Sequence, residues 1–324
     1  MTLKMSDVAF KGRLPEVPAA MPVVGLKSAS LDDRQAAIKR LGEHLKLDRT
    51  RTAQLDHATI IGNERGDIHY FHASGGMFAR DATAAKAFPN ELRKWEGAER
   101  RTDGTFALKP DAAKRLLEGT RGLLEPIGLL GREVSGTTVQ LEQVAQFDAK
   151  GRQLDQGAGQ AAIKFAYAIE GVPARGAGAK TLAFADPASG DPRITDVFHG
   201  WRAPAGSAAN VRLGSLGSAL AAGLLTDPEL DLYHAAGHSV TVTRIELVYL
   251  ALPVFVRQAH LFPAFEIEGV VSEGKKGISF NFGRYHHAAT PQAYAAADLA
   301  GSYLMTNPDG LNPLPRRPTR AEAA

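Results

Sequence analysis

Residues Ala161–Val172 read AAIKFAYAIEGV, and apolar side chains occupy every second position of this stretch. Ile163, Phe165, Tyr167 and Ile169 make up the alternating set. Successive side chains of a β-strand point to opposite faces of a sheet. The alternation therefore predicts a strand with one buried face.

Strand-like segments flank this stretch on both sides. Thr137–Phe147 precedes it, and Lys180–Ala185 and Arg193–Arg202 follow it after turns at 171–178 and 186–192. Connections this short join antiparallel neighbours. The sequence therefore predicts four consecutive strands in an antiparallel meander.

The first half of the chain predicts an entry strand, a helix, a hairpin and a second helix. Met21–Leu26 is the entry strand, and Ser30 is a suitable N-cap for the first helix. Leu55–Ile61 and Ile68–Phe71 flank a turn rich in glycine, asparagine and aspartate, as a hairpin requires. Pro110 opens the second helix, because proline suits the first helical turn.

The second half continues after its meander with a glycine-rich helix at Asn210–Leu225 and strands at His238–Leu252 and Phe262–Val271. Both halves thus predict a helix packed on an antiparallel sheet. The expected fold class is α+β with two domains, at 1–130 and 131–306, followed by a proline-rich tail at 307–324.

Composition excludes several functional classes. The chain is 44% hydrophobic and 23% charged, contains no cysteine and carries a formal net charge of +3. So small a basic surplus argues against a nucleic-acid partner, and the missing cysteines exclude disulfides and thiolate chemistry. No apolar run is long enough to span a membrane. No secretion signal is evident, so the chain as written is expected to be cytoplasmic, or extracytoplasmic if a leader has been removed.

Segments in a common order carry a resemblance to a known family: Leu14–Leu26, Tyr167–Ala179, Val197–Arg202 and the strand pair Ile245–Leu252 and Leu261–Gly269. They resemble bacterial PepSY-like, cystatin-like proteins. The resemblance implies a pair of domains in which a curved sheet wraps a helix. It also implies an extracytoplasmic protein that binds or restrains another, such as a peptidase inhibitor or a modulator of a sensor kinase, and it implies no catalytic residues.

The candidate binding residues are His199, Trp201 and Arg202. Alternation places His199 and Trp201 on one strand face and Arg202 on the other. An exposed tryptophan beside a hydrogen-bond donor suits recognition. The alternative stays open that Trp201 caps the core while Arg202 pairs with a carboxylate.

These observations favour a binding or regulatory protein that recognises a protein or peptide through a sheet face or a sheet edge. The alternative is an isomerase, lyase or hydrolase with an apolar pocket in the sheet concavity that holds a histidine or a glutamate. Glu266 and Glu268 lie two residues apart on a predicted strand and are candidate paired carboxylates. No catalytic residue or cofactor is predicted, and a small-molecule ligand stays open.

Histidines offer a second alternative, a metal-binding protein. His57, His69 and His72 lie on or beside one predicted hairpin. Cross-strand neighbours on one face of a hairpin can share a metal ion through their imidazole nitrogens. His69 and His72 are three residues apart and would face opposite ways in an unbroken strand, which weakens this set.

Overall fold

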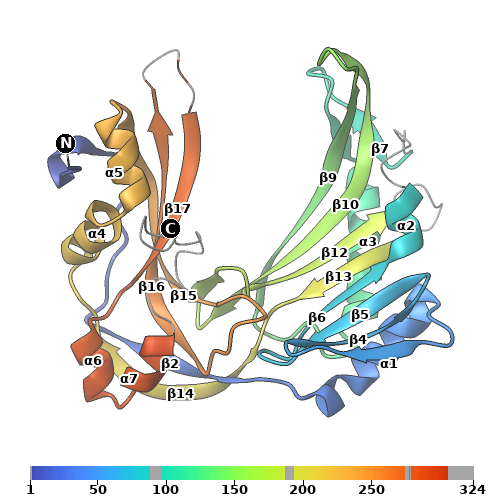
Figure 1. Cartoon of the computed structure of the whole chain (residues 1–324), viewed down its shortest axis with the longest axis horizontal. Helices are drawn as coiled ribbons and strands as arrows, with labels where there is room; N and C mark the ends of the chain where they lie inside the picture. Colours follow the sequence, from blue (N-terminus) through green and yellow to red (C-terminus); the bar gives the residue numbers. More distant parts are fainter. Residues whose placement is uncertain (1, 88–95, 187–192, 274–276, 278, 306–324) are drawn as a thin grey trace, which may run out of the picture. The chain divides into compact units, whose positions relative to one another are not determined.

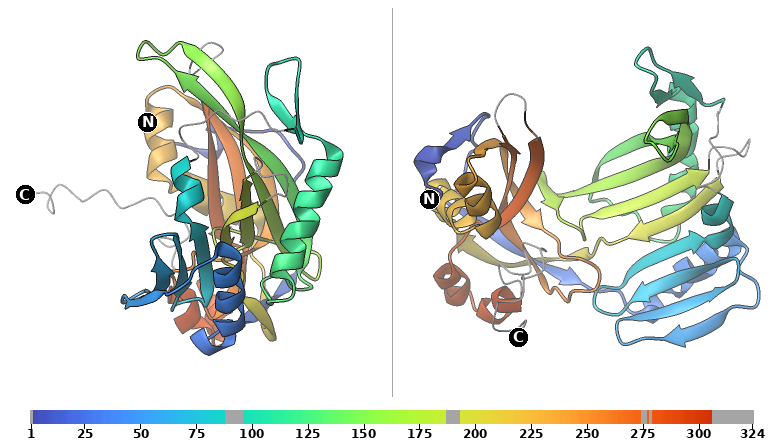
Figure 2. Two further views of the ribbon diagram at one scale, coloured as in Figure 1. Left: turned by 90° about the vertical axis from the view of Figure 1, so that its right-hand side faces the viewer. Right: turned by 45° about the horizontal axis from the view of Figure 1, so that its top comes forward.

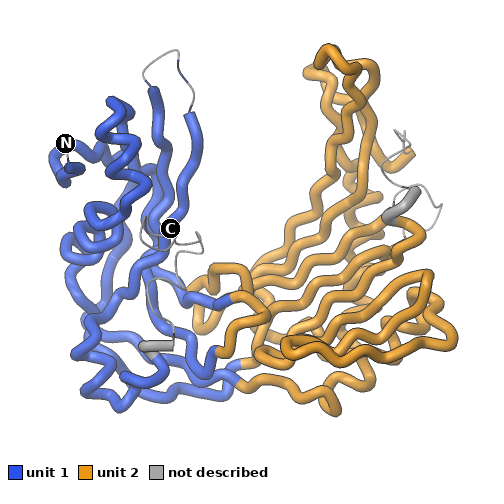
Figure 3. The backbone as a smooth tube through the Cα atoms, in the orientation of Figure 1, with its two compact units in different colours: residues 1–26, 204–252, 258–324 blue, residues 27–203, 253–257 orange. Residues whose placement is uncertain are grey.

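The computed structural model describes residues 2–87, 96–186, 193–273, 277 and 279–305. The chain forms two compact units, which Figure 3 distinguishes by colour. Unit 1 comprises residues 1–26, 204–252 and 258–324, and unit 2 comprises residues 27–203 and 253–257.

The two units do not follow the predicted boundary at residue 130. β6 (Gly76–Asp81) from the first half of the chain pairs with β13 (Arg193–His199) from the second half. This ladder joins both halves in one sheet of unit 2. The predicted tail at 307–324 lies outside the described residues.

Unit 2 is built on an antiparallel sheet (Figure 1). Its neighbours run in the order β10 (Gln153–Ile169), β12 (Lys180–Asp186), β13, β6, β5 (Gly66–Phe71), β4 (Ala58–Asn63) and β3 (Arg51–Gln54). β10 also pairs with β9 (Val134–Phe147) and, at its end, with β11 (Val172–Arg175). The predicted meander of four strands is confirmed as β9, β10, β12 and β13.

Two helices cover one face of this sheet (Figure 2). In α1 (Leu31–Leu45) the predicted cap is confirmed, because the Ser30 hydroxyl accepts the Asp33 N–H and the Asp33 carboxylate accepts the Ser30 N–H. In α3 (Pro110–Leu124) proline occupies the first turn. A short α2 (Ala82–Ala87) and the hairpin β7 (Ala98–Arg100) and β8 (Phe106–Leu108) complete the unit.

The core of unit 2 lies between the helices and the sheet. Leu41 of α1 and Leu116 of α3 are almost fully buried against Ile68, Ile163 and Phe165 of the strands. The alternation in Ala161–Val172 is thus confirmed, with Ile163, Phe165 and Tyr167 all fully buried.

In unit 1, β14 (Ala203–Arg212), β2 (Ala20–Lys27), β16 (His260–Ser272) and β15 (Ser239–Leu250) are successive neighbours. β17 (Ser279–His287) pairs with β16, and β1 (Val8–Phe10) runs parallel to β15. The helical elements are η1 (Met5–Asp7), α4 (Leu216–Leu225), α5 (Pro228–Ala235), α6 (Pro291–Ala296) and α7 (Ala300–Met305). Leu220, Leu224 and Leu230 pack on Phe265 and Ile267 of the sheet.

The expected fold of two cystatin-like domains, each a sheet wrapped on a helix, is wrong. The protein is mostly β, with 23% helix. Within the described residues, nine of the 15 sheet strands lie in unit 2 with two long helices, and six lie in unit 1 with short helices. The sequence patterns predicted several of the strands locally but not the β6–β13 ladder, which depends on residues more than a hundred positions apart.

One predicted helix is only partly correct. Asn210–Leu225 was expected to be helical throughout, but β14 continues to Arg212 and the helix begins at Leu216. The N–H of Gly214 donates to the carbonyl of Ala288, which ties this segment to the chain after β17. No helix among the described residues is long and apolar enough to cross a membrane.

Candidate functional site

β3 forms an edge of the sheet in unit 2. Among the described residues it pairs with β4 alone, and all four of its residues are exposed. The Leu55 N–H donates to the Ala58 carbonyl at the hairpin turn. Along an antiparallel ladder, every second residue directs its N–H and C=O groups toward the neighbouring strand. Ala53 and Arg51 therefore also direct their backbone groups toward β4. The N–H and C=O groups of Thr52 and Gln54 therefore point away from the sheet, where another strand can pair with them.

A groove lies beside this edge on the helix-covered face of the sheet. It has a volume of about 550 Å³ and lies between α1, the loop from Lys46 to Thr50, and strands β4 and β5. Its apolar lining consists of Ile38, Leu47, Ile61 and Ile68. Thr52 is the register partner of Ile61, which in turn pairs with Ile68, so the edge strand continues the same row of side chains.

The loop between α1 and β3 forms one wall of the groove. It leaves the helix through Lys46, whose φ of 57° lies in the left-handed region, and Arg49 is left-handed as well with φ 52°. The side-chain amide of Asn63 donates to the Asp48 carbonyl at 2.6 Å and ties the loop to the end of β4. Two left-handed residues in so short a connection turn the chain directly from the helix into the edge strand.

His199, the first predicted binding residue, is buried in the core of unit 2 and is 3% exposed. Arg34 Nη2 lies 3.1 Å from His199 Nε2, and Nδ1 lies 2.8 Å from the Thr181 hydroxyl. Arginine can only donate, so Nε2 accepts and the imidazole proton is on Nδ1. The Thr181 hydroxyl in turn lies 2.6 Å from the Tyr167 hydroxyl. Burial, reinforced by Arg34, holds the pKa of His199 well below its ordinary value.

Trp201 and Arg202 are buried too, at 5% and 3% exposure, so the expectation of an exposed tryptophan is wrong. The indole stacks on Tyr167 with ring centroids 4.5 Å apart. Arg202 Nη2 donates to the carbonyls of Val256 at 2.6 Å and Pro253 at 3.2 Å. Trp201 thus caps the core, as the open alternative held, while Arg202 binds backbone carbonyls.

Two of the three histidines of the metal hypothesis have separate partners, and the third is exposed. His72 Nε2 lies 2.9 Å from the Thr59 hydroxyl, and His69 Nε2 lies 2.9 Å from Asp67. His57 is exposed in the turn between β3 and β4. The described part of the chain contains no group of three histidine, aspartate or glutamate side chains placed to hold a metal ion.

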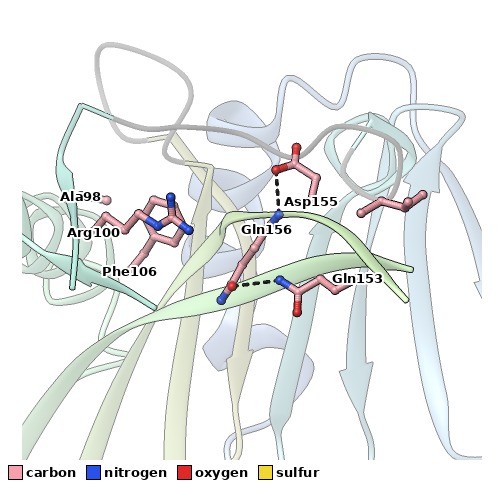
Figure 4. A pocket seen from close by; sticks show the side chains of 7 residues that line it. Ala98, Arg100, Phe106, Gln153, Asp155 and Gln156 are labelled. Carbon is pink, nitrogen blue, oxygen red and sulfur yellow. Dashed lines mark hydrogen bonds between the residues drawn. The ribbon is translucent and has the colours of Figure 1, made fainter. Parts of the chain in front are cut away.

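A second open hollow, of about 510 Å³, lies between the β7–β8 hairpin and the start of β10 (Figure 4). Arg100 and Phe106 face Gln153 and Gln156 across it, and Gln153 Nε2 donates to Gln156 Oε1 at 3.1 Å. No described lining residue of this hollow is a histidine or a glutamate.

Glutamate is one of the residue types that the enzyme alternative requires, and one lines the groove beside β3. The groove beside β3 contains Glu43, but its side chain is 53% exposed and forms an ion pair with Arg40 at 3.7 Å.

The predicted carboxylate pair is held by an arginine in unit 1. Arg244 donates to Glu266 at 2.7 Å, to Glu268 at 2.8 Å and to Glu246 at 2.8 Å. The Tyr285 hydroxyl donates to Glu266 at 2.7 Å. These contacts, with the Glu268 hydrogen bond foremost, raise the pKa of Arg244 above its ordinary value. The carboxylates therefore serve an ion-pair network on the sheet.

The edge strand β3 was not predicted from the sequence. Its residues, Arg-Thr-Ala-Gln, contain no large apolar side chain and therefore show no hydrophobic alternation. The one available signal was a pair of threonines two residues apart, Thr50 and Thr52, since β-branched residues favour strands.

Neither a protein-family model nor a curated protein sequence matches this chain. The chain is similar to a solved structure, described as an uncharacterized protein from Eubacterium rectale ATCC 33656. The TM-score is 0.50 at 13% sequence identity, over 84% of this chain and 85% of that chain. The resemblance to PepSY-like proteins stays a prediction. At this identity the likeness shows a shared fold alone, and the function has to be argued from the residues.

Proposed function

We propose that this protein is a binding protein that takes up an extended segment of a protein or peptide partner along β3. One observation carries the proposal: the outward N–H and C=O groups of Thr52 and Gln54 lie on an edge whose four residues are all exposed. Main-chain hydrogen bonds to such an edge supply affinity, and the neighbouring groove supplies selectivity for side chains.

The local sequence makes this edge suitable for pairing. Sheet edges that avoid other chains carry prolines, bulges, charged side chains or covering loops, and the charged side chain of β3 is Arg51. β3 contains no proline, and its register with β4 runs without a shift from Arg51 to Gln54. A partner strand would therefore meet regular, unobstructed backbone groups.

The test is a selection of peptides from a random display library on the full-length protein, followed by affinity measurement on two variants. Thr52→Pro removes the outward N–H and leaves the bonds to β4 in place, whereas Thr52→Val keeps the N–H and the side-chain shape. We expect the selected peptides to lose at least about tenfold in affinity for Thr52→Pro, roughly 1.4 kcal/mol, and to keep it for Thr52→Val.

Hydrogen exchange provides the second readout. Bound peptide is expected to slow exchange at the amides of Thr52 and Gln54. If no peptide is enriched, or if enriched peptides bind Thr52→Pro as well as the unmodified protein and leave these amides unprotected, the proposal is wrong.

A further inference from the structure

We infer that the segment bound along β3 is acidic and places an apolar side chain over Thr52, into the groove between α1 and β4. This inference rests on the proposed function and adds the chemistry of the partner. It follows from the charges at the rim of the groove, from its apolar floor and from the small side chain of Thr52 at its border.

The rim of the groove is basic. Three of its lining residues carry positive charge and two carry negative charge: Lys39, Lys46, Arg65, Glu43 and Asp48. Glu43 forms a surface ion pair with Arg40 at 3.7 Å, so part of the negative charge of the rim already has a partner. The adjoining edge adds Arg49 and Arg51, both exposed.

The rim cations are available for a partner. Within the described residues, Lys39, Lys46 and Arg65 take part in no ion pair, and all three are exposed. An acidic chain lying along β3 would gain charge-assisted contacts with them. A basic chain would meet like charges, which weaken binding. The whole chain carries only +3, so this clustering is a local property.

The floor of the groove is apolar and can be reached from the edge. Ile68 and Ile38 are 1% and 7% exposed, and Ile61 is partly buried above them. Neighbouring strands lie about 4.8 Å apart, so a long apolar side chain opposite Thr52 extends over this small residue toward Ile61. A bulky residue in place of Thr52 would close that route.

The experiment uses synthetic peptides of equal length with apolar residues at alternate positions and Glu, Lys or Gln between them. Their affinities for the full-length protein are measured by fluorescence anisotropy at several salt concentrations. We expect the Glu peptide to bind at least about tenfold more tightly than the Lys peptide, with the Gln peptide between them. Added salt should reduce this difference, because it screens exposed charges.

Two variants and one control test whether the rim and the floor of the groove cause the difference in affinity. Reversing two rim charges in Lys39→Glu/Arg65→Glu is expected to abolish the preference for the Glu peptide. The matched control Lys150→Glu reverses an exposed charge in the β9–β10 turn and should leave the preference unchanged. Ile61→Ser should weaken all three peptides by a similar factor. Circular dichroism of each variant verifies its folding.

The outcomes separate this inference from the proposed function. If all peptides bind equally and Thr52→Pro weakens them all, the edge is a binding site but the partner is not acidic. If no peptide shows binding that depends on Thr52→Pro, both proposals are wrong. If light scattering shows self-association that Thr52→Pro abolishes, a second copy of the chain occupies the edge and the inference is wrong.

Discussion

The guanidinium of Arg34 lies 3.1 Å from Nε2 of His199 and keeps a positive charge beside a buried imidazole. Because the guanidinium donates to Nε2, a proton on that nitrogen would break the hydrogen bond and place two positive charges together. His199 is therefore neutral in the folded protein, and with Thr181 and Tyr167 it forms a series of hydrogen bonds that connects α1 to three strands of the sheet in unit 2.

This arrangement predicts a loss of stability in mild acid. The pKa of His199 is lower in the folded protein than its ordinary value of 6.5, so the unfolded chain takes up the proton first as pH falls. The contribution to stability is full above about pH 6.5 and declines below it, by up to about 1.4 kcal/mol per pH unit. Urea unfolding at a series of pH values measures the slope.

His199→Gln is expected to flatten that slope while lowering stability at neutral pH by about 1–3 kcal/mol, because buried hydrogen bonds are lost. Some slope should remain, since burial also lowers the pKa values of His44 and His286. His57→Gln, at an exposed position, is the control. An unchanged slope in His199→Gln would show that another group causes the acid sensitivity.

The ladder between β3 and β4 predicts that proline lowers stability by different amounts at adjacent positions. Ala53 directs its N–H toward β4, so Ala53→Pro removes a ladder hydrogen bond and should destabilise the protein by about 1–3 kcal/mol. Thr52 directs its N–H outward, so Thr52→Pro should cost less than about 1 kcal/mol. Chemical denaturation compares the two. Equal costs would mean that the assigned register of the edge is wrong.

The left-handed residue at the end of α1 predicts a stabilising substitution. Lys46 has φ 57°, a conformation that glycine adopts without steric cost. Lys46→Gly should raise the free energy of unfolding by about 0.5–1 kcal/mol. Lys39→Gly, within the same helix, should lower it by about 1 kcal/mol. If Lys46→Gly destabilises the protein instead, this residue contributes contacts that outweigh its backbone strain.

The N-cap of α1 predicts a loss of stability when its side chain is removed. The Ser30 hydroxyl accepts the N–H of Asp33 at 3.1 Å, and hydrogen bonds from Ser30 lower the pKa of the Asp33 carboxyl. Ser30→Ala should lower stability by about 1 kcal/mol. Ser28→Ala, two residues earlier and outside the helix, is the matched control and should change little. Thermal unfolding of both variants measures the difference.

Local patterns predicted much of the secondary structure. The alternation of Ile163, Phe165 and Tyr167 predicted a buried strand face, and Ser30 and Pro110 predicted the starts of α1 and α3, because these signals act between residues close in sequence. The segment Asn210–Ser215 was misassigned as helix, because β14 continues to Arg212 and the N–H groups of Leu213 and Gly214 donate to carbonyls that are distant in sequence.

The candidate site could not be predicted from local sequence patterns. Trp201 was a candidate for an exposed binding residue, with capping of the core as the open alternative, and it stacks on Tyr167 in the core. β3 was missed because its exposed residues carry no apolar period. Whether a residue is exposed depends on what the rest of the chain packs over it.

Helix starts and the spacing of buried side chains were thus determined by the sequence alone, since hydrogen bonds and sterics among near neighbours decide them. Only the tertiary structure decided that β6 pairs with β13 and that β3 is left at an edge. Backbone groups are alike along the chain, so a strand's partner is selected by the burial that the whole fold achieves rather than by the strand's own residues.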